Sequence, residues 1–213
     1  TRSAAGTKTD TPLNEIPQSI TVVTADQIKD QASPTMQEVL RYTPGVRNEQ
    51  YGIDNRGDCF AMRGGSESAT VLDGLKLPLA GYWGFLRNEP YAFDRVEVLR
   101  GATSLLYGQT SYGPGGMVNM VSKLPLATPH HEVSAQLGNY EHKQVMADTT
   151  GALTDDSTWR YRLVSLVKRS GTQVEHAYEE RELFFPSVMW QPNSGLSLTA
   201  YFQYQRDESD NTN

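Results

Sequence analysis

The sequence predicts a small α+β domain, with a mixed β-sheet and short helices, followed by the opening antiparallel strands of a transmembrane β-barrel. Between Phe93 and Lys123, a strand, a glycine turn, a short apolar helix, a glycine-rich loop and a second strand follow one another. From His130 onward, short segments alternate apolar and polar residues, as half-buried strands do. No run approaches the roughly 18 apolar residues that a membrane-spanning helix needs. We place the two domains at residues 1–126 and 127–213.

The composition narrows the class of protein. The 213 residues carry a net charge of −6, and no basic stripe interrupts them, which argues against nucleic acid as a partner. The mean hydropathy of −0.53 is that of a soluble protein, but barrel strands also give such averages because they alternate. Cys59 is the only cysteine, so the chain holds no internal disulfide, and we expect a buried thiol.

The elements of the first domain follow from local patterns. Residues 1–15 are polar and punctuated by proline, so we expect a disordered or extended arm. A β-branched strand over residues 19–24 leads into a short helix that reaches Ile28. A second helix starts at residues 33–34 and ends before Pro44. Short strands are expected at residues 59–62 and 70–72, the second followed by the hairpin turn at residues 73–74.

The second domain shows its clearest pattern over residues 196–204, where apolar and polar residues alternate strictly. Strand-like runs at residues 132–138, 142–151, 158–171 and 181–190 precede it, joined by polar turns, which suits an antiparallel meander. Trp159, Tyr161, Trp190 and Tyr204 lie near strand ends, where a membrane barrel carries its aromatic girdle. A soluble β-sandwich with aromatic residues in its core is the alternative.

Four blocks of the first domain occur in the order typical of the plug domain of TonB-dependent outer-membrane receptors. They are residues 6–24, 39–46, 62–74 with an Arg-Gly and an Asp-Gly pair, and 93–123. Four ordered blocks are far more specific than any one alone. The chain resembles the ferric-hydroxamate siderophore receptors of the ferrichrome type. This resemblance continues through residues 161–163 and 186–192, although the loop over residues 108–116 is slightly longer here.

The resemblance implies a gated importer in the Gram-negative cell outer membrane, surrounded by membrane lipid. Its plug would sit inside a barrel of about 22 strands. The receptor would capture a ferric siderophore, and the inner-membrane-driven protein TonB would pull on the plug to admit it. No further cofactor is expected, because iron would arrive bound to the siderophore. Phage and bacteriocins are further partners of this family. Five strands cannot close a barrel, so we expect a longer protein.

Two loops of the first domain offer candidate ligand contacts. A ferric hydroxamate is compact and rich in oxygen, so aromatic walls and a few donors suit it. The residues of this kind are Tyr82, Trp83, Phe85 and Arg87 in one loop and Tyr51 and Arg56 in the other. We predict that Tyr82 and Trp83 touch the ligand directly. Alternatively, these side chains pack against the barrel wall.

Charged residues alternate on the strand of the central motif. Arg95, Glu97 and Arg100 share this strand, and the resemblance implies that they form charge pairs between plug and barrel. A solvated strand face is the alternative.

Other motifs argue against catalysis and metal binding. The glycine spacing over residues 108–113 lacks the Gly-Lys-Ser/Thr ending of a phosphate loop. His130 and His131 are neighbours on a strand and point to opposite faces, so they are poorly placed to chelate a metal. No serine, histidine and carboxylate grouping stands out, and we predict that the protein is not an enzyme.

Other cargoes and one other class remain open. A TonB-dependent receptor for vitamin B12, haem or another metal chelate would share these motifs. Haem would favour axial histidines in the two plug loops, which contain none. A soluble plug-like binding or signalling module is the alternative class, and the alternating strands after His130 argue against it.

Overall fold

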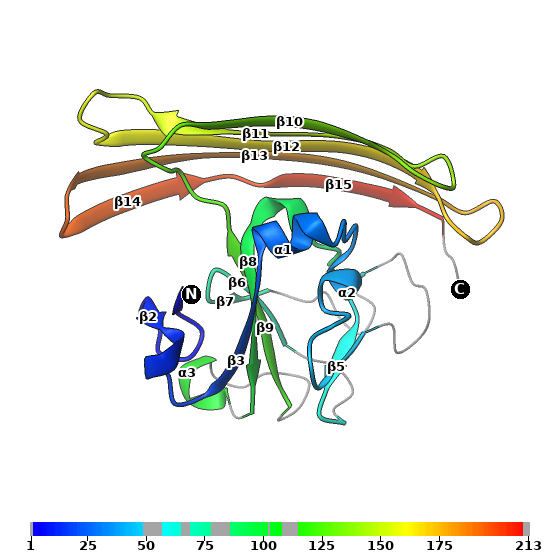
Figure 1. Cartoon of the computed structure of the whole chain (residues 1–213), viewed down its shortest axis with the longest axis horizontal. Coiled ribbons are helices and arrows are strands. Elements are labelled where there is room, and N and C mark those ends of the chain that lie inside the picture. Colours follow the sequence, from blue (N-terminus) through cyan, green and yellow to red (C-terminus); the bar gives the residue numbers. More distant parts are fainter. Residues whose placement is uncertain are drawn as a thin grey trace. The chain divides into compact units, whose positions relative to one another are not determined.

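The computed structural model describes residues 2–48, 57–64, 69–77, 86–101, 103–107 and 115–210 (Figure 1). The chain divides into two compact units, Thr1–Ser122 and Lys123–Asn213. The boundary predicted at residue 126 stays a prediction. Within the described ranges, no helix has the length and apolar character needed to cross a membrane.

A five-stranded sheet in the order β3-β8-β9-β6-β7 forms the centre of the first unit. Its strands are β3 (Ser19–Thr24), β6 (Ala69–Leu72), β7 (Leu75–Lys76), β8 (Phe93–Arg100) and β9 (Gly116–Ser122). β6 runs parallel to β9 and the other pairs are antiparallel, which confirms the predicted mixed sheet. The central strands are the most deeply buried, and Val96, Val98, Val118 and Met120 are fully inaccessible.

Short helices join these strands, and a threonine side chain caps the start of the first two. The Thr24 hydroxyl accepts a hydrogen bond from the Gln27 N–H (3.3 Å) and starts α1 (Ala25–Asp30), which runs beyond the predicted end. The Thr35 hydroxyl accepts from the Glu38 N–H (3.2 Å) and starts α2 (Met36–Val39). This second helix is shorter than predicted at both ends: its cap lies at Thr35 and not at residues 33–34, and it stops at Val39 with Leu40 as its C-cap. The predicted apolar helix of the central motif is α3 (Ser104–Tyr107).

The N-terminal residues are ordered, so the prediction of a disordered or extended arm is wrong for residues 2–15. Strands β1 (Arg2–Ser3) and β2 (Thr11–Pro12) pair, and the 3₁₀ helix η1 (Leu13–Glu15) follows. Ala5 is fully buried in a cluster with Val71, Leu99 and Met117. A small apolar side chain thus anchors a segment whose polar composition predicts disorder. The remaining short elements are β4 (Val46–Asn48), which pairs with β5 (Phe60–Met62), and η2 (Pro90–Ala92).

One predicted turn, and one glycine from the predicted glycine-rich loop, take the backbone geometry that their residues favour. Asp73 and Gly74 both have positive φ, 49° and 79°, as a tight hairpin turn between β6 and β7 requires. Gly116 has a φ of 141°, and a Cβ there would lie 2.2 Å from the carbonyl oxygen of Leu99. Only glycine therefore fits where β9 begins beside β8.

The second unit is a six-stranded sheet in which every pair is antiparallel, as predicted. Its strands are β10 (His130–Leu137), β11 (Lys143–Ala152), β12 (Trp159–Gly171), β13 (Tyr178–Asn193), β14 (Leu196–Tyr201) and β15 (Tyr204–Ser209). β10 to β13 form a meander, and β14 and β15 both pair with β13. The strand predicted over residues 196–204 is thus interrupted between Tyr201 and Tyr204.

Candidate functional site

The ends of residues 49–56 are both tied to helix α2. The Asn48 side chain donates from Nδ2 to the carbonyl oxygen of Gln37 (2.7 Å). The Gln37 side chain donates from Nε2 to the carbonyl oxygen of Gly57 (3.0 Å) and is only 6% exposed. One buried glutamine therefore fixes the start and the end of this loop.

The end of the same loop is joined to the end of residues 78–85. The Asp58 N–H donates to the carbonyl oxygen of Leu86 (3.2 Å). The Oδ2 of Asp58 accepts from the Asn88 backbone N–H (2.8 Å) and from its side-chain Nδ2 (2.9 Å). A carboxylate that accepts two such bonds makes a strong contact, because a charged acceptor strengthens each bond. Gln37, Asp58 and Asn88 form what we call the loop base.

The loop base carries the two segments in which the predicted ligand contacts lie. Tyr51, Arg56, Tyr82, Trp83 and Phe85 fall outside the described residues. Arg87 is half-buried and stands between Leu86 and Asn88, both members of the loop-base contacts.

Sequence reasoning missed the loop base itself. Asp58 and Asn88 are 30 positions apart, and no local pattern announces their contact. The one available signal was the presence of an aspartate and an asparagine next to two long loops, residues that often anchor such segments.

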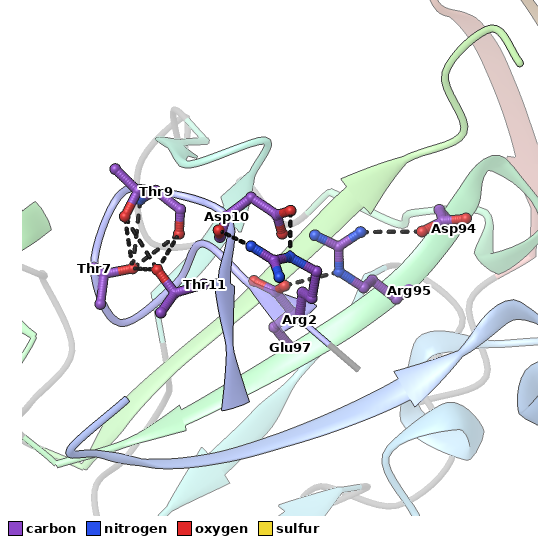
Figure 2. Close-up of polar contacts among 8 residues, drawn as sticks. All are labelled: Arg2, Thr7, Thr9, Asp10, Thr11, Asp94, Arg95 and Glu97. Carbon is purple, nitrogen blue, oxygen red and sulfur yellow. Dashed lines mark hydrogen bonds and ion pairs between the residues drawn. The ribbon is translucent and has the colours of Figure 1, made fainter. Parts of the chain in front are cut away.

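The buried carboxylate of Glu97 on β8 binds the neighbouring Arg95 side chain (Figure 2). Glu97 is fully buried and accepts from Arg95 Nε (2.8 Å) and from Asn119 Nδ2 (2.9 Å). Arg95 also binds Asp94 through Nη1 (3.0 Å). Burial alone would lower the pKa of Arg95, but the hydrogen bonds and charges of Glu97 and Asp94 outweigh it and raise that pKa. The Asn119 Oδ1 accepts from the Gly74 N–H (3.0 Å), so the network reaches the β6–β7 turn.

Arg100 is bound within the first unit as well. Its Nε donates to the carbonyl oxygen of Pro44 (2.8 Å), and its Nη2 donates to the Thr21 hydroxyl (2.7 Å). Burial, and then the charge of Arg63, lowers the pKa of Arg100. The predicted pairing of Arg95, Glu97 and Arg100 with the barrel wall stays a prediction.

The N-terminal segment, residues 2–12, contacts the rest of the first unit through Tyr107. The Tyr107 hydroxyl donates to the carbonyl oxygen of Ala5 (3.0 Å). The Lys8 ammonium lies 3.4 Å from the Tyr107 ring centroid and donates to the carbonyl oxygen of Gly74 (3.2 Å). Burial, reinforced by the charge of Glu97, raises the pKa of Tyr107 to about 12.

Within the docked segment, polar side chains close on one another (Figure 2). Arg2 Nε binds Asp10 at 2.6 Å. The hydroxyls of Thr7 and Thr11 lie 2.9 Å apart, and the Thr9 hydroxyl lies within 3.2 Å of both. These contacts hold the β1–β2 hairpin together.

One face of the second unit is apolar and exposed. Val133 and Leu137 on β10 are 79% and 85% exposed, and Val167 on β12 is 56% exposed. Trp159 and Trp190 are paired across β12 and β13 at one edge of this apolar face, with ring centroids 6.1 Å apart. The other end is charged, with a cavity of about 350 Å³. Residues that line it on this face are Val167, Arg169, Glu180, Glu182, Arg206 and Glu208.

The opposite face of the same sheet is buried and carries charges. Lys168 and Arg181 are each 1% exposed, and they pair with Glu179 and Asp207 respectively. Charged residues buried behind an apolar exposed face invert the pattern of a soluble sandwich and match a membrane-barrel wall.

Other predicted features can be placed. Cys59 is buried, as expected. Across the described ranges, no three His, Cys, Asp or Glu side chains gather as a metal site would require. His130 lies 3.7 Å from Glu132 on the same strand.

Comparison with known proteins agrees with this architecture. Residues 12–115 match the family model described as the TonB-dependent Receptor Plug Domain. The ferrichrome outer membrane transporter/phage receptor of Escherichia coli (strain K12) is 38% identical over 208 residues, which are 95% of this chain and 27% of that protein. The ferrioxamine receptor of Yersinia enterocolitica is 37% identical over 213 residues, 98% of this chain and 29% of that protein.

Solved structures share the fold across both units. Pseudomonas aeruginosa FpvA bound to a heterologous pyoverdine superposes with a TM-score of 0.89 at 27% identity, over 98% of this chain and 28% of that one. The FpvAI–pyocin S2 complex gives 0.86 at 27% identity, over 98% of this chain and 27% of that one. The chain thus spans somewhat more than a quarter of the length of these proteins. It belongs to the family of TonB-dependent outer-membrane receptors, with the plug domain over residues 12–115.

Proposed function

We propose that the receptor containing this chain captures a ferric hydroxamate siderophore at the cell surface and imports it into the periplasm with energy supplied through TonB. The loop base is the observation that carries this proposal. Asp58 and Asn88 bring together the ends of two loops rich in aromatic and arginine residues. Relatives named for ferrichrome and ferrioxamine, at 38% and 37% identity, support the hydroxamate class.

In this proposal the two loops bind and the plug moves. Tyr82, Trp83 and Phe85 would form an aromatic wall, and Arg56 and Arg87 would donate to the ligand oxygens. Iron is cargo, bound by the siderophore, and the protein needs no cofactor and performs no catalysis. A ligand can shift the plug only by binding one of its states more tightly than another.

The apolar face of the second unit supports the proposed location in a membrane. Its exposed valine and leucine side chains would meet membrane lipid, and the paired Trp159 and Trp190 would lie at an interface.

A titration of the full-length receptor tests the cargo. Quenching of its tryptophan fluorescence by ferrichrome, ferrioxamine B, a ferric catecholate, haem and cobalamin should show saturation with the ferric hydroxamates. Tyr82→Ala combined with Trp83→Ala should weaken that binding by about tenfold or more, since burying one large apolar side chain contributes roughly 1.5–3 kcal/mol. Binding of haem or cobalamin with no response to hydroxamates would refute the proposal.

A bacteriocin is a second candidate ligand. The structural relative in complex with pyocin S2 favours it. Competition between a ferric hydroxamate and a labelled bacteriocin for the full-length receptor should show mutual displacement if both use the surface loops. Simultaneous binding would separate the two sites.

A further inference from the structure

The two units are joined at the peptide bond between Ser122 and Lys123, and a carboxylate holds the residue on each side of it. On the side of the first unit, Asp73 accepts from the Ser122 N–H (2.8 Å) and from the Ser122 hydroxyl (2.7 Å). On the side of the second unit, Asp148 accepts from Lys123 Nζ (3.0 Å). Each of these two residues is therefore held within its own unit.

The contact on the second side belongs to a buried charge cluster, defined as Lys123, Asp148 and Arg162. Arg162 grips Asp148 with two bonds, Nε to Oδ1 (2.9 Å) and Nη2 to Oδ2 (2.8 Å). The three side chains are 10%, 3% and 8% exposed, in the order of the definition. Such a two-pronged pair fixes orientation as well as distance.

The backbone that follows Lys123 is held to the same strands. The carbonyl oxygen of Leu124 accepts from Arg162 Nη1 (3.0 Å). The Leu126 N–H donates to the Thr150 hydroxyl (2.9 Å), which in turn donates to the carbonyl oxygen of Tyr161 (2.7 Å). Residues 123–126 are thus fastened at three points to β11 and β12.

The two contacts differ in the charge of their donors and in burial. The two donors that Ser122 offers to Asp73 are a backbone amide and a hydroxyl, both neutral, and Asp73 is half-buried. The donors to Asp148 are two cations in a buried place. Removing one partner of a buried ion pair is strongly destabilising, because it leaves an uncompensated buried charge.

We infer that Asp148 is a positioning residue that fastens residues 123–126 to the first strands of the second unit. Residues 123–126 are then the fixed end of the plug when its N-terminal side is pulled. Only this last role rests on the proposed function.

Trypsin tests this attachment in the full-length receptor, because the protease must take Lys123 into its own pocket to cut the bond to Leu124. Wild-type receptor should resist this cut. Asp148→Asn should accelerate it by at least about tenfold, since it breaks a buried pair. Asp148→Glu should largely restore resistance. Glu180→Gln is the matched control, because it breaks an exposed ion pair to Arg169 (3.2 Å) on the neighbouring strand pair and should change nothing.

The variant Asp73→Asn tests the contact to Ser122 independently of the contact to Lys123. It should speed hydrogen exchange of the Ser122 amide and leave the bond after Lys123 resistant. The inference is overturned if Asp148→Asn is cut no faster than Glu180→Gln, or if Asp73→Asn exposes that bond equally.

If the Asp148→Asn receptor does not fold, a variant that changes no buried charge tests the same attachment. Thr150→Val removes the acceptor of the Leu126 N–H and should raise exchange of that amide about fivefold, the effect of one hydrogen bond. An unprotected Leu126 amide in the wild type would contradict the attachment. None of these measurements needs siderophore or TonB. Their outcome is therefore independent of whether the ligand titration supports the proposed cargo. In cells, Asp148→Asn should reduce uptake at unchanged siderophore affinity, and normal uptake would remove the fixed-end role.

Discussion

The hydroxyl of Tyr107 fastens the N-terminal segment to the plug, and Tyr107→Phe removes it while keeping the ring beneath Lys8. The lost hydrogen bond to the carbonyl oxygen of Ala5 (3.0 Å) contributes about 0.5–1.5 kcal/mol. At the middle of that range the undocked population rises about fivefold. Lys8→Met removes a cation 3.4 Å from the ring centroid and the bond to Gly74. Each of these contributes about 0.5–1 kcal/mol at an exposed site, so undocking should rise about tenfold.

Hydrogen exchange of residues 3–9 in the full-length receptor measures this docking, because the Lys8 N–H donates to the carbonyl oxygen of Ala4 (2.8 Å) in the docked segment. Both variants should speed exchange there and leave the amides of β8 and β9 unchanged. The double variant should show less than the sum of the two effects, because Lys8 and Tyr107 contact each other. Arg2→Gln is the control, since it breaks an exposed pair with Asp10 that contributes little. The reasoning fails if Tyr107→Phe exchanges like the wild type, or if Arg2→Gln opens the segment as far.

Three further changes test other parts of the plug. Gly116→Ala would place a Cβ 2.2 Å from the carbonyl oxygen of Leu99 at a φ of 141°, so calorimetry should show a plug destabilised by about 2–4 kcal/mol; an unchanged transition would contradict this. Asp58→Ala removes the acceptor of both Asn88 bonds and should weaken siderophore affinity about tenfold in a fluorescence titration, whereas full affinity would show that the loop base does not position the loops. Because burial raises the pKa of Tyr107 from 10.0 to about 12, its contribution to docking should be complete below pH 10 and disappear as the pH rises through about 12; tyrosinate absorbance and exchange of residues 3–9 should change together, and independent changes would refute the link.

The features that the sequence predicted are those encoded by neighbouring residues. Asp73 and Gly74 favour positive φ wherever they occur, so the hairpin turn was visible without its partner strands. The β-branched residues of β3 and the strand–glycine–helix order around Gly101 are likewise local. Even so, the start of α2 was misplaced, since Ser33 and Thr35 are both good caps and only the folded chain selects Thr35.

The features that escaped prediction depend on contacts between distant residues. Ala5 carries no local sign that it will be buried beside Val71 and Leu99. The loop base joins Asp58 to Asn88, and the charge cluster joins Lys123 to Asp148. Each of these needs the folded sheet to bring its partners together. Polar composition, which predicted a disordered or extended arm, is outweighed when one small apolar side chain fits a core.

The second unit shows why alternation alone left two classes of protein open. A period of two says that the faces of a strand differ, but it does not say which face is inward. In a soluble sandwich the charged face meets water and the apolar face is buried. Here Leu137 is 85% exposed, whereas Lys168 and Arg181 are 1% exposed and paired with carboxylates. Leaving such apolar side chains in water costs about 25 cal/mol per Å² of apolar surface, whereas hydrocarbon removes that cost. Lipid in place of water on the apolar face would remove this cost, and the buried charges Lys168 of β12 and Arg181 of β13 favour the membrane barrel over the soluble sandwich, which periodicity could not separate.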